Sequence, residues 1–171
     1  MNDMNYFELF DIPVQLKVDK SALSHRYFLL SKKYHPDYFV KGSEEEQATA
    51  LEKSALLNKA WKTFQNPDET LKYVLLLKGL LEEEEKYELP ADFLMEVMEI
   101  NEQLMDTESV STAQLGTRIN DLQTEIYEPV KKIIEGYHEG VTTEKELLEV
   151  KDYYYKKKYL DRIRRQLAGM A

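Results

Sequence analysis

Apolar residues recur along this chain at the spacing of one face of an α-helix. In the N-terminal part, four of them fall at positions i, i+4, i+7 and i+11: Leu23, Tyr27, Leu30 and Tyr34. No segment alternates apolar and polar residues with the period of two that a half-buried strand requires. The 171 residues include 6 glycines and 5 prolines, fewer than average usage supplies, so few positions break a helix. The chain is therefore predicted to be all-α.

Caps and prolines divide the N-terminal part into a helical hairpin. The first long helix can be capped by Asp19 or Ser21. It ends before Pro36, because the residue that precedes a proline is pushed out of the helical region. The second helix opens at Ser43, where three glutamates follow and suit the positive end of the helix dipole. An Asn-Pro pair at 66–67 stops this second helix.

The C-terminal part is predicted to contain three more helices, over residues 92–106, 111–137 and 142–167. Before them lies a segment with four consecutive glutamates that ends near Pro90 and is typical of a charged connector. Three antiparallel helices with short connections form a bundle. We therefore expect three parts: a helical-hairpin domain at 1–79, an acidic connector at 80–91 and a three-helix bundle at 92–171.

Composition excludes several classes of function. The chain has 32 acidic and 23 basic side chains and a formal charge of −9, which argues against a general nucleic-acid or anionic-membrane binder. It has no cysteine, so it has no disulfide and no thiolate, and its histidines are scattered at His25, His35 and His138. We expect no metal and no cofactor. No basic leader and no apolar run near the length of a membrane span is present, so a soluble cytoplasmic protein is predicted.

Charge is unevenly distributed along the sequence. Residues 20–41 hold five Lys and Arg against one Asp, whereas residues 80–110 hold eleven acids and one lysine. A further basic run at 156–158 in the last predicted helix could contact RNA, but such runs are more often solvated or paired with neighbouring acids. The two oppositely charged regions indicate two protein-binding surfaces.

The tripeptide His35-Pro36-Asp37 is the sharpest functional feature. It lies in the bend between the two helices of the hairpin. Pro36 would hold His35 on an exposed bend, and the Asp37 carboxylate could accept a charge-assisted hydrogen bond from a cationic group of a partner. The alternative is that His35 and Asp37 only cap and stiffen the turn. Acid-base catalysis is not predicted, because no nucleophile or third member accompanies the pair.

This setting resembles a J domain, the DnaJ-type module that stimulates the ATPase of 70-kDa heat-shock chaperones. The matching features are a short helix at 6–10, Pro13, the tripeptide, and the segment 57–64 before the Asn-Pro pair, and they cover residues 1 to about 79. In J domains the basic face of the first hairpin helix docks on the acidic chaperone ATPase. The resemblance implies this chaperone-binding surface: His35, Pro36, Asp37, His25, Arg26, Lys32 and Lys33. Phe28 and Leu29 depart from it, since many J domains are basic there. An ordinary solvated face is the alternative.

The first helix of the predicted bundle carries two apolar stripes. Phe93, Val97, Ile100 and Leu104 suffice as its core stripe. The second stripe, Leu94, Met98 and Met105, is bordered by Met95 and by acids, and methionine suits adaptable contacts. This second stripe is either a partner surface or a packing face against another helix.

The order of the modules, the total length, and the segments 73–79 and 93–96 resemble the HscB family, the J-type co-chaperones of iron-sulfur cluster assembly. In that family the bundle binds the scaffold protein IscU and delivers it to the chaperone HscA. The resemblance implies this scaffold-binding surface: Leu94, Met95, Met98, Glu99, Glu102, Asp106 and Tyr159. Met98, Asp106 and Tyr159 stand where Leu, Glu and Phe are usual in the family. For Tyr159, simple core packing is the alternative.

The predicted function is that of a co-chaperone and not an enzyme. It would stimulate a chaperone of the HscA/DnaK class and deliver IscU to it, with no nucleic-acid or membrane partner. Two alternatives remain open. One is a J protein that brings a different client to a general DnaK chaperone, and the other is a structural helical protein with a fortuitous tripeptide.

Overall fold

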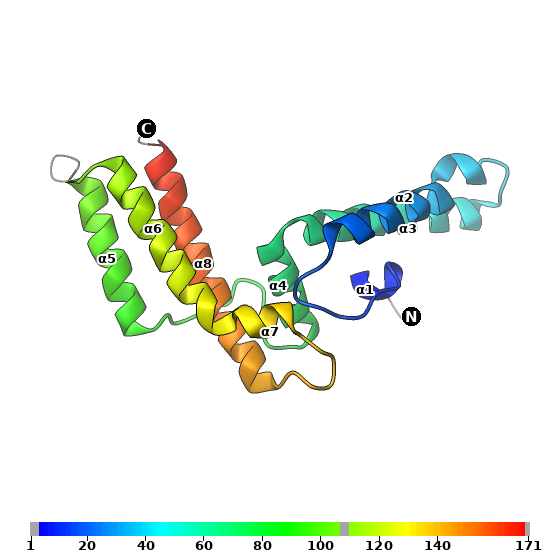
Figure 1. Ribbon diagram of the computed structural model, residues 1–171. Helices are drawn as coiled ribbons and strands as arrows, with labels where there is room; N and C mark the ends of the chain where they lie inside the picture. Colours follow the sequence, from blue (N-terminus) through cyan, green and yellow to red (C-terminus); the bar gives the residue numbers. More distant parts are fainter. Residues whose placement is uncertain (1–3, 107–109, 170–171) are drawn as a thin grey trace. The chain divides into compact units, whose positions relative to one another are not determined.

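The computed structural model describes residues 4–106 and 110–169, and every regular element in these ranges is helical (Figure 1). The all-α prediction is confirmed. In chain order the α-helices are α1 (Tyr6–Leu9), α2 (Lys20–Tyr34), α3 (Glu44–Gln65), α4 (Pro67–Leu77), α5 (Ala91–Met105), α6 (Thr112–Tyr127), α7 (Lys131–Glu135) and α8 (Glu144–Gly169), with 3₁₀ turns η1 (Pro36–Phe39) and η2 (Glu128–Val130). None of the helices in these ranges is long and apolar enough to cross a membrane.

The chain forms two compact units. The first is built from residues up to Val74 together with Tyr137–Val141, and the second from Leu75–Gly136 together with the chain from Thr142 onward. α4 runs across the division between them. The boundaries expected at residues 79 and 91 stay a prediction.

The hairpin of the first unit consists of α2 and α3, which lie side by side (Figure 1). The Asp19 side chain caps α2 by accepting hydrogen bonds from two backbone N–H groups of its first turn. At the other end, His35 has an extended backbone (φ −62°, ψ 128°), as expected of a residue that precedes a proline. The helices are joined by Tyr27, whose ring stacks on Trp61 at 4.5 Å and whose hydroxyl donates to Asn58 at 2.9 Å.

An aromatic cluster fixes α1 to the rest of the first unit. The Phe64 ring lies 5.1 Å from Phe7 and 5.5 Å from Phe10, and all three side chains are buried. Tyr6 stacks on Tyr73 at 4.1 Å, and the Tyr6 backbone N–H donates to the Tyr73 hydroxyl oxygen at 2.9 Å. Burial raises the pKa of Tyr73. This cluster supplies the core that holds the hairpin as a folded module.

The second unit is a three-helix bundle of α5, α6 and α8. Its core contains the predicted α5 stripe, so that assignment is confirmed. α6 and α8 contribute the other buried members: Leu115, Ile119, Leu122, Leu160 and Ile163.

The prediction of a single helix over residues 111–137 is wrong in its C-terminal part. α6 ends at Tyr127, the η2 turn follows, and α7 begins at Lys131. Pro129 explains the interruption, because proline has no backbone N–H and its ring clashes with the carbonyl one turn earlier in an α-helix.

The segment expected as an acidic connector is attached to α8. Glu85 forms an ion pair with Lys151 at 2.7 Å, and this hydrogen bond lowers the pKa of the Glu85 carboxyl. The Tyr87 hydroxyl donates to Asp152 at 2.8 Å while its ring stacks on Tyr155 at 4.5 Å. Burial and the neighbouring Asp152 carboxylate raise the pKa of Tyr87. The residues before α5 therefore pack as part of the bundle.

Candidate functional site

The His-Pro-Asp bend joins α2 to η1. The Asp37 backbone N–H donates to Nδ1 of His35 at 3.2 Å, so the His35 side chain accepts a backbone hydrogen bond at the start of η1. The same Nδ1 lies 3.6 Å from the Asp37 carboxylate. The Asp37 side chain is 85% exposed. The alternative in which the pair caps the turn therefore applies to the His35 side chain, whereas the Asp37 carboxylate faces solvent.

A shallow pocket of about 410 Å³ lies beside this bend. Its lining comes from the last turn of α2 and from η1: Ser31, Lys32, His35, Asp37 and Tyr38. The pocket brings a carboxylate, an ammonium group and an imidazole into one small area. Sequence reasoning did not single out Tyr38, which is 70% exposed. The signal that could have identified Tyr38 is its position directly after the tripeptide.

The residues predicted for the basic face of α2 divide into two groups. His25, Lys32 and Lys33 are exposed, and the two lysines approach the ring faces of Phe28 and Tyr34 at 4.6 and 5.3 Å. Arg26 differs, because its guanidinium donates to the backbone carbonyls of Phe10 and Asp11 at 2.7 Å each. Arg26 therefore holds the chain that follows α1 against α2.

The second apolar stripe of α5 packs on the bundle at only part of its length. Met98 is 59% exposed and Met105 is 90% exposed, and the neighbouring Met95 is 69% exposed. Leu94 is half-buried and contacts the bundle core. Three exposed methionines on one helix form an adaptable apolar surface of the kind that binds partner proteins.

The remaining residues of the predicted scaffold surface have different environments. Glu102 and Asp106 are exposed, and Asp106 forms the C-cap of α5. Glu99 pairs with Arg118 of α6 at 2.6 Å, so its charge is partly neutralised within the bundle. Tyr159 is half-buried against the same core as Leu94, with the Arg162 guanidinium 5.7 Å from its ring. Core packing thus accounts for part of the Tyr159 side chain.

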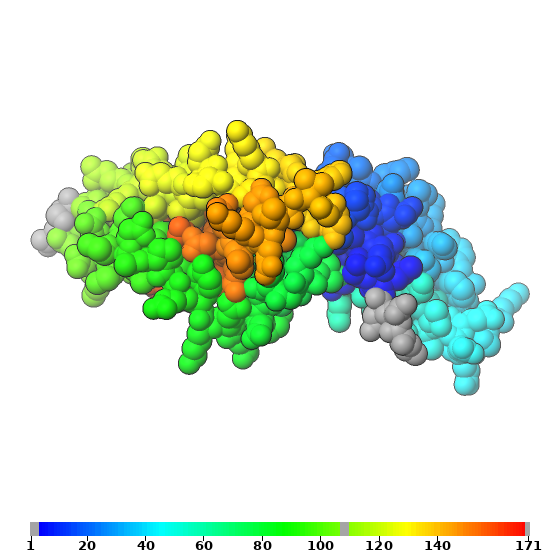
Figure 2. Space-filling model, turned by 90° about the horizontal axis from the view of Figure 1, so that it is seen from below, coloured from blue at the N-terminus to red at the C-terminus, as the bar shows by residue number. Residues whose placement is uncertain are grey.

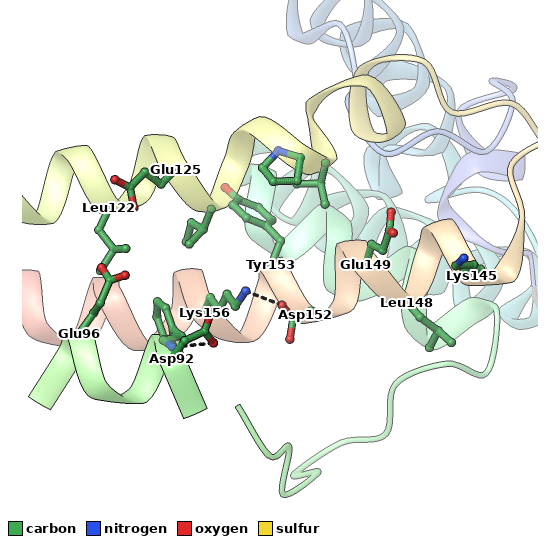
Figure 3. A pocket seen from close by; sticks show the side chains of 14 residues that line it. Asp92, Glu96, Leu122, Glu125, Lys145, Leu148, Glu149, Asp152, Tyr153 and Lys156 are labelled. Carbon is green, nitrogen blue, oxygen red and sulfur yellow. Dashed lines mark hydrogen bonds and ion pairs between the residues drawn. The ribbon is translucent and has the colours of Figure 1, made fainter. Parts of the chain in front are cut away.

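A cleft of about 590 Å³ lies in the bundle between the start of α5, the end of α6 and the first half of α8 (Figure 3). In the space-filling view this half of α8, coloured orange, reaches the surface between the green and yellow segments (Figure 2). Apolar side chains such as Phe93 and Tyr153 line the cleft, and its acids include Asp152, which pairs with Lys156 at 2.7 Å. No group of three potential metal ligands occurs among the residues that the structure describes. None of the residues predicted for the scaffold surface lines this cleft.

The basic run of α8 is largely paired. Lys156 contacts Asp152 and Lys157 contacts Asp161, both across one helical turn, and Arg164 also contacts Asp161. This pairing favours the interpretation that the run is paired with neighbouring acids, and it argues against RNA binding.

Comparison with known proteins finds a matching family model and similar solved structures. Residues 89–168 match the model of the HSCB C-terminal oligomerisation domain. The chaperone HscB from Vibrio cholerae is 27% identical, with 98% of this chain and 97% of that chain covered and a TM-score of 0.74. The human co-chaperone protein HscB is 30% identical, with 98% of this chain and 82% of that chain covered and a TM-score of 0.78.

Proposed function

The chain belongs to the HscB family of co-chaperones, with an N-terminal J domain and a C-terminal helical bundle, and on that basis we propose that it acts as a two-module adaptor. The J domain stimulates ATP hydrolysis by a heat-shock chaperone of the HscA/DnaK class. The bundle delivers the iron-sulfur scaffold protein IscU to that chaperone. The observation that carries the proposal is the exposed Asp37 carboxylate beside the His35-capped bend.

The J domain acts by recognition. The rigid bend presents Asp37 to a cationic group of the chaperone, and a charge-assisted hydrogen bond there is stronger than a neutral one. His25, Lys32 and Lys33 add positive charge along α2, which suits an acidic ATPase surface. The bonds of ATP are broken on the partner, so the chain itself works as an activator and not as an enzyme.

The bundle holds the client through the α5 surface. Met95 and Met98 provide exposed apolar contacts, Glu102 and Asp106 provide a polar rim, and Leu94 and Tyr159 lie at its half-buried edge. Because the chain contains no cysteine, the thiolate ligands of an iron-sulfur cluster would come from the scaffold. Joining client and ATPase activator in one chain raises the effective concentration of the client beside the chaperone.

Two measurements on the full chain test this function. Binding of purified IscU-type scaffold, followed by calorimetry, separates scaffold delivery from a J protein that serves a different client. Stimulation of the steady-state ATPase of an HscA-class chaperone separates both from a purely structural helical protein. Absence of stimulation would refute the J-domain role, and absence of scaffold binding would refute the delivery role.

A further inference from the structure

The outward face of α2 carries two large apolar side chains that the hairpin does not bury. Phe28 is 55% exposed and Leu29 is 53% exposed. At about 100° per residue, both lie away from Leu23, the buried residue of α2, and on either side of Lys32. Contact with α3 is made by Tyr27 instead, through Trp61. The two side chains are therefore available to a partner.

These apolar side chains are interleaved with positive charge. The Lys32 ammonium lies 4.6 Å from the centre of the Phe28 ring, a cation–π arrangement. His25 precedes Leu29 by one helical turn and is also exposed. We name His25, Phe28, Leu29 and Lys32 the apolar-cationic face. Exposed apolar groups next to charge are typical of a protein-binding surface.

The apolar-cationic face is continuous with the pocket at the His-Pro-Asp bend. Lys32 belongs to both, since it also lines the pocket that contains His35, Asp37 and the exposed Tyr38. A partner that reaches Asp37 along α2 therefore also meets Phe28 and Leu29. Phe28 and Leu29 lie within the basic region of an otherwise acidic chain. A complementary partner surface therefore carries negative charge around its apolar patch.

We infer that the apolar-cationic face docks on an apolar patch bordered by carboxylates on the chaperone ATPase, so that burial of Phe28 and Leu29 sets much of the affinity. This inference rests on the proposed J-domain function and adds the chemistry of the partner surface. Apolar burial is insensitive to screening, whereas exposed charge pairs weaken as salt rises. The two contributions can therefore be separated by their response to salt.

The test measures the concentration of full chain that half-maximally stimulates an HscA-class chaperone, at low and at high salt. The variants are Phe28→Gln/Leu29→Gln, Lys32→Gln and the control Leu51→Gln, which replaces a 62% exposed leucine of α3. Glutamine is a good helix former, so α2 stays intact, and circular dichroism checks this. We expect the double variant to require at least about tenfold more protein at both salt concentrations. The Lys32→Gln deficit shrinks at high salt, and Leu51→Gln behaves as wild type.

Three results would overturn the inference. One is that the double variant stimulates the chaperone as well as the wild-type chain does. Another is that the deficit of the double variant disappears at high salt. The third is self-association of the wild-type chain that the double variant abolishes with stimulation unchanged, which would make the face a contact between copies. Failure of the J-domain function itself is distinguishable, because the wild-type chain would then give no stimulation at either salt concentration.

Discussion

Asp37 donates its backbone N–H to Nδ1 of His35 at 3.2 Å, while its own carboxylate remains 85% exposed. The two residues thus have different tasks in one bend. His35 satisfies the backbone of η1, and Pro36 fixes the φ angle between them. The arrangement positions a carboxylate at a defined place in solvent.

Asp37→Asn removes the charge of that carboxylate and keeps the backbone hydrogen bond to His35. We expect stimulation of the chaperone ATPase to fall close to the unstimulated rate. The unfolding free energy should change by no more than about 0.5 kcal/mol, as is usual for an exposed side chain. Glu52→Gln is the matched control, because it neutralises an exposed carboxylate of α3 in the same unit that lies outside the predicted chaperone-binding surface. Full stimulation by Asp37→Asn would contradict the proposed mechanism.

Met95→Ala/Met98→Ala removes the most exposed apolar contacts predicted for the scaffold surface. Both side chains face solvent, so the bundle should keep its stability while scaffold affinity falls by about tenfold or more, measured by calorimetry. The triple variant Leu94→Ala/Met98→Ala/Tyr159→Ala should weaken binding further and also destabilise the bundle, because Leu94 and Tyr159 contact its core.

Leu148→Ala is the control for these variants, since Leu148 is a 44% exposed leucine of the same bundle that lines the separate cleft. It should leave scaffold affinity unchanged. The surface assignment is wrong if Leu148→Ala weakens binding and Met95→Ala/Met98→Ala does not, because the cleft would then be the client site.

The Glu85–Lys151 ion pair predicts a pH dependence of stability. The hydrogen bond from Lys151 lowers the pKa of Glu85 in the folded chain, so the pair stabilises the fold fully above the unfolded pKa of about 4.3. That stabilisation is lost as the pH falls through the lower folded value. Lys151→Gln should reduce the unfolding free energy by about 1 kcal/mol at neutral pH, and the difference from wild type should fade in acid. Urea unfolding at pH 7 and pH 3 checks this, and a difference of equal size at both pH values would argue against it.

Phe64→Ala should destabilise the J domain by about 3–5 kcal/mol, because the ring is buried among Tyr6, Phe7 and Phe10. Loss of this ring also releases α1. Thermal unfolding, with hydrogen exchange of the α1 and α3 amides, measures the effect. Phe64→Leu keeps most of the volume and should cost less than Phe64→Ala. Equal losses for both variants would contradict this expectation, because the volume that leucine retains would then contribute nothing to stability.

Local signals in the sequence were sufficient for the hairpin and for the α5 core. The Asp19 cap and the stop before Pro36 depend on neighbouring backbone alone, which is why they could be predicted. The break at Pro129 carried the same kind of signal but was missed. The carbonyls that Arg26 binds and the attachment of Tyr87 to Asp152 could not be predicted, because the partners lie 15 to 65 residues away and meet only in the folded chain.

The central claim is that one chain couples an ATPase activator to a scaffold carrier. Its most direct test is the steady-state ATPase of an HscA-class chaperone, measured with full chain alone, with scaffold alone and with both together. Because the bundle brings the client to the chaperone that the J domain activates, we expect stimulation by both together to exceed the sum of the separate effects. Stimulation equal to that sum would contradict the adaptor account.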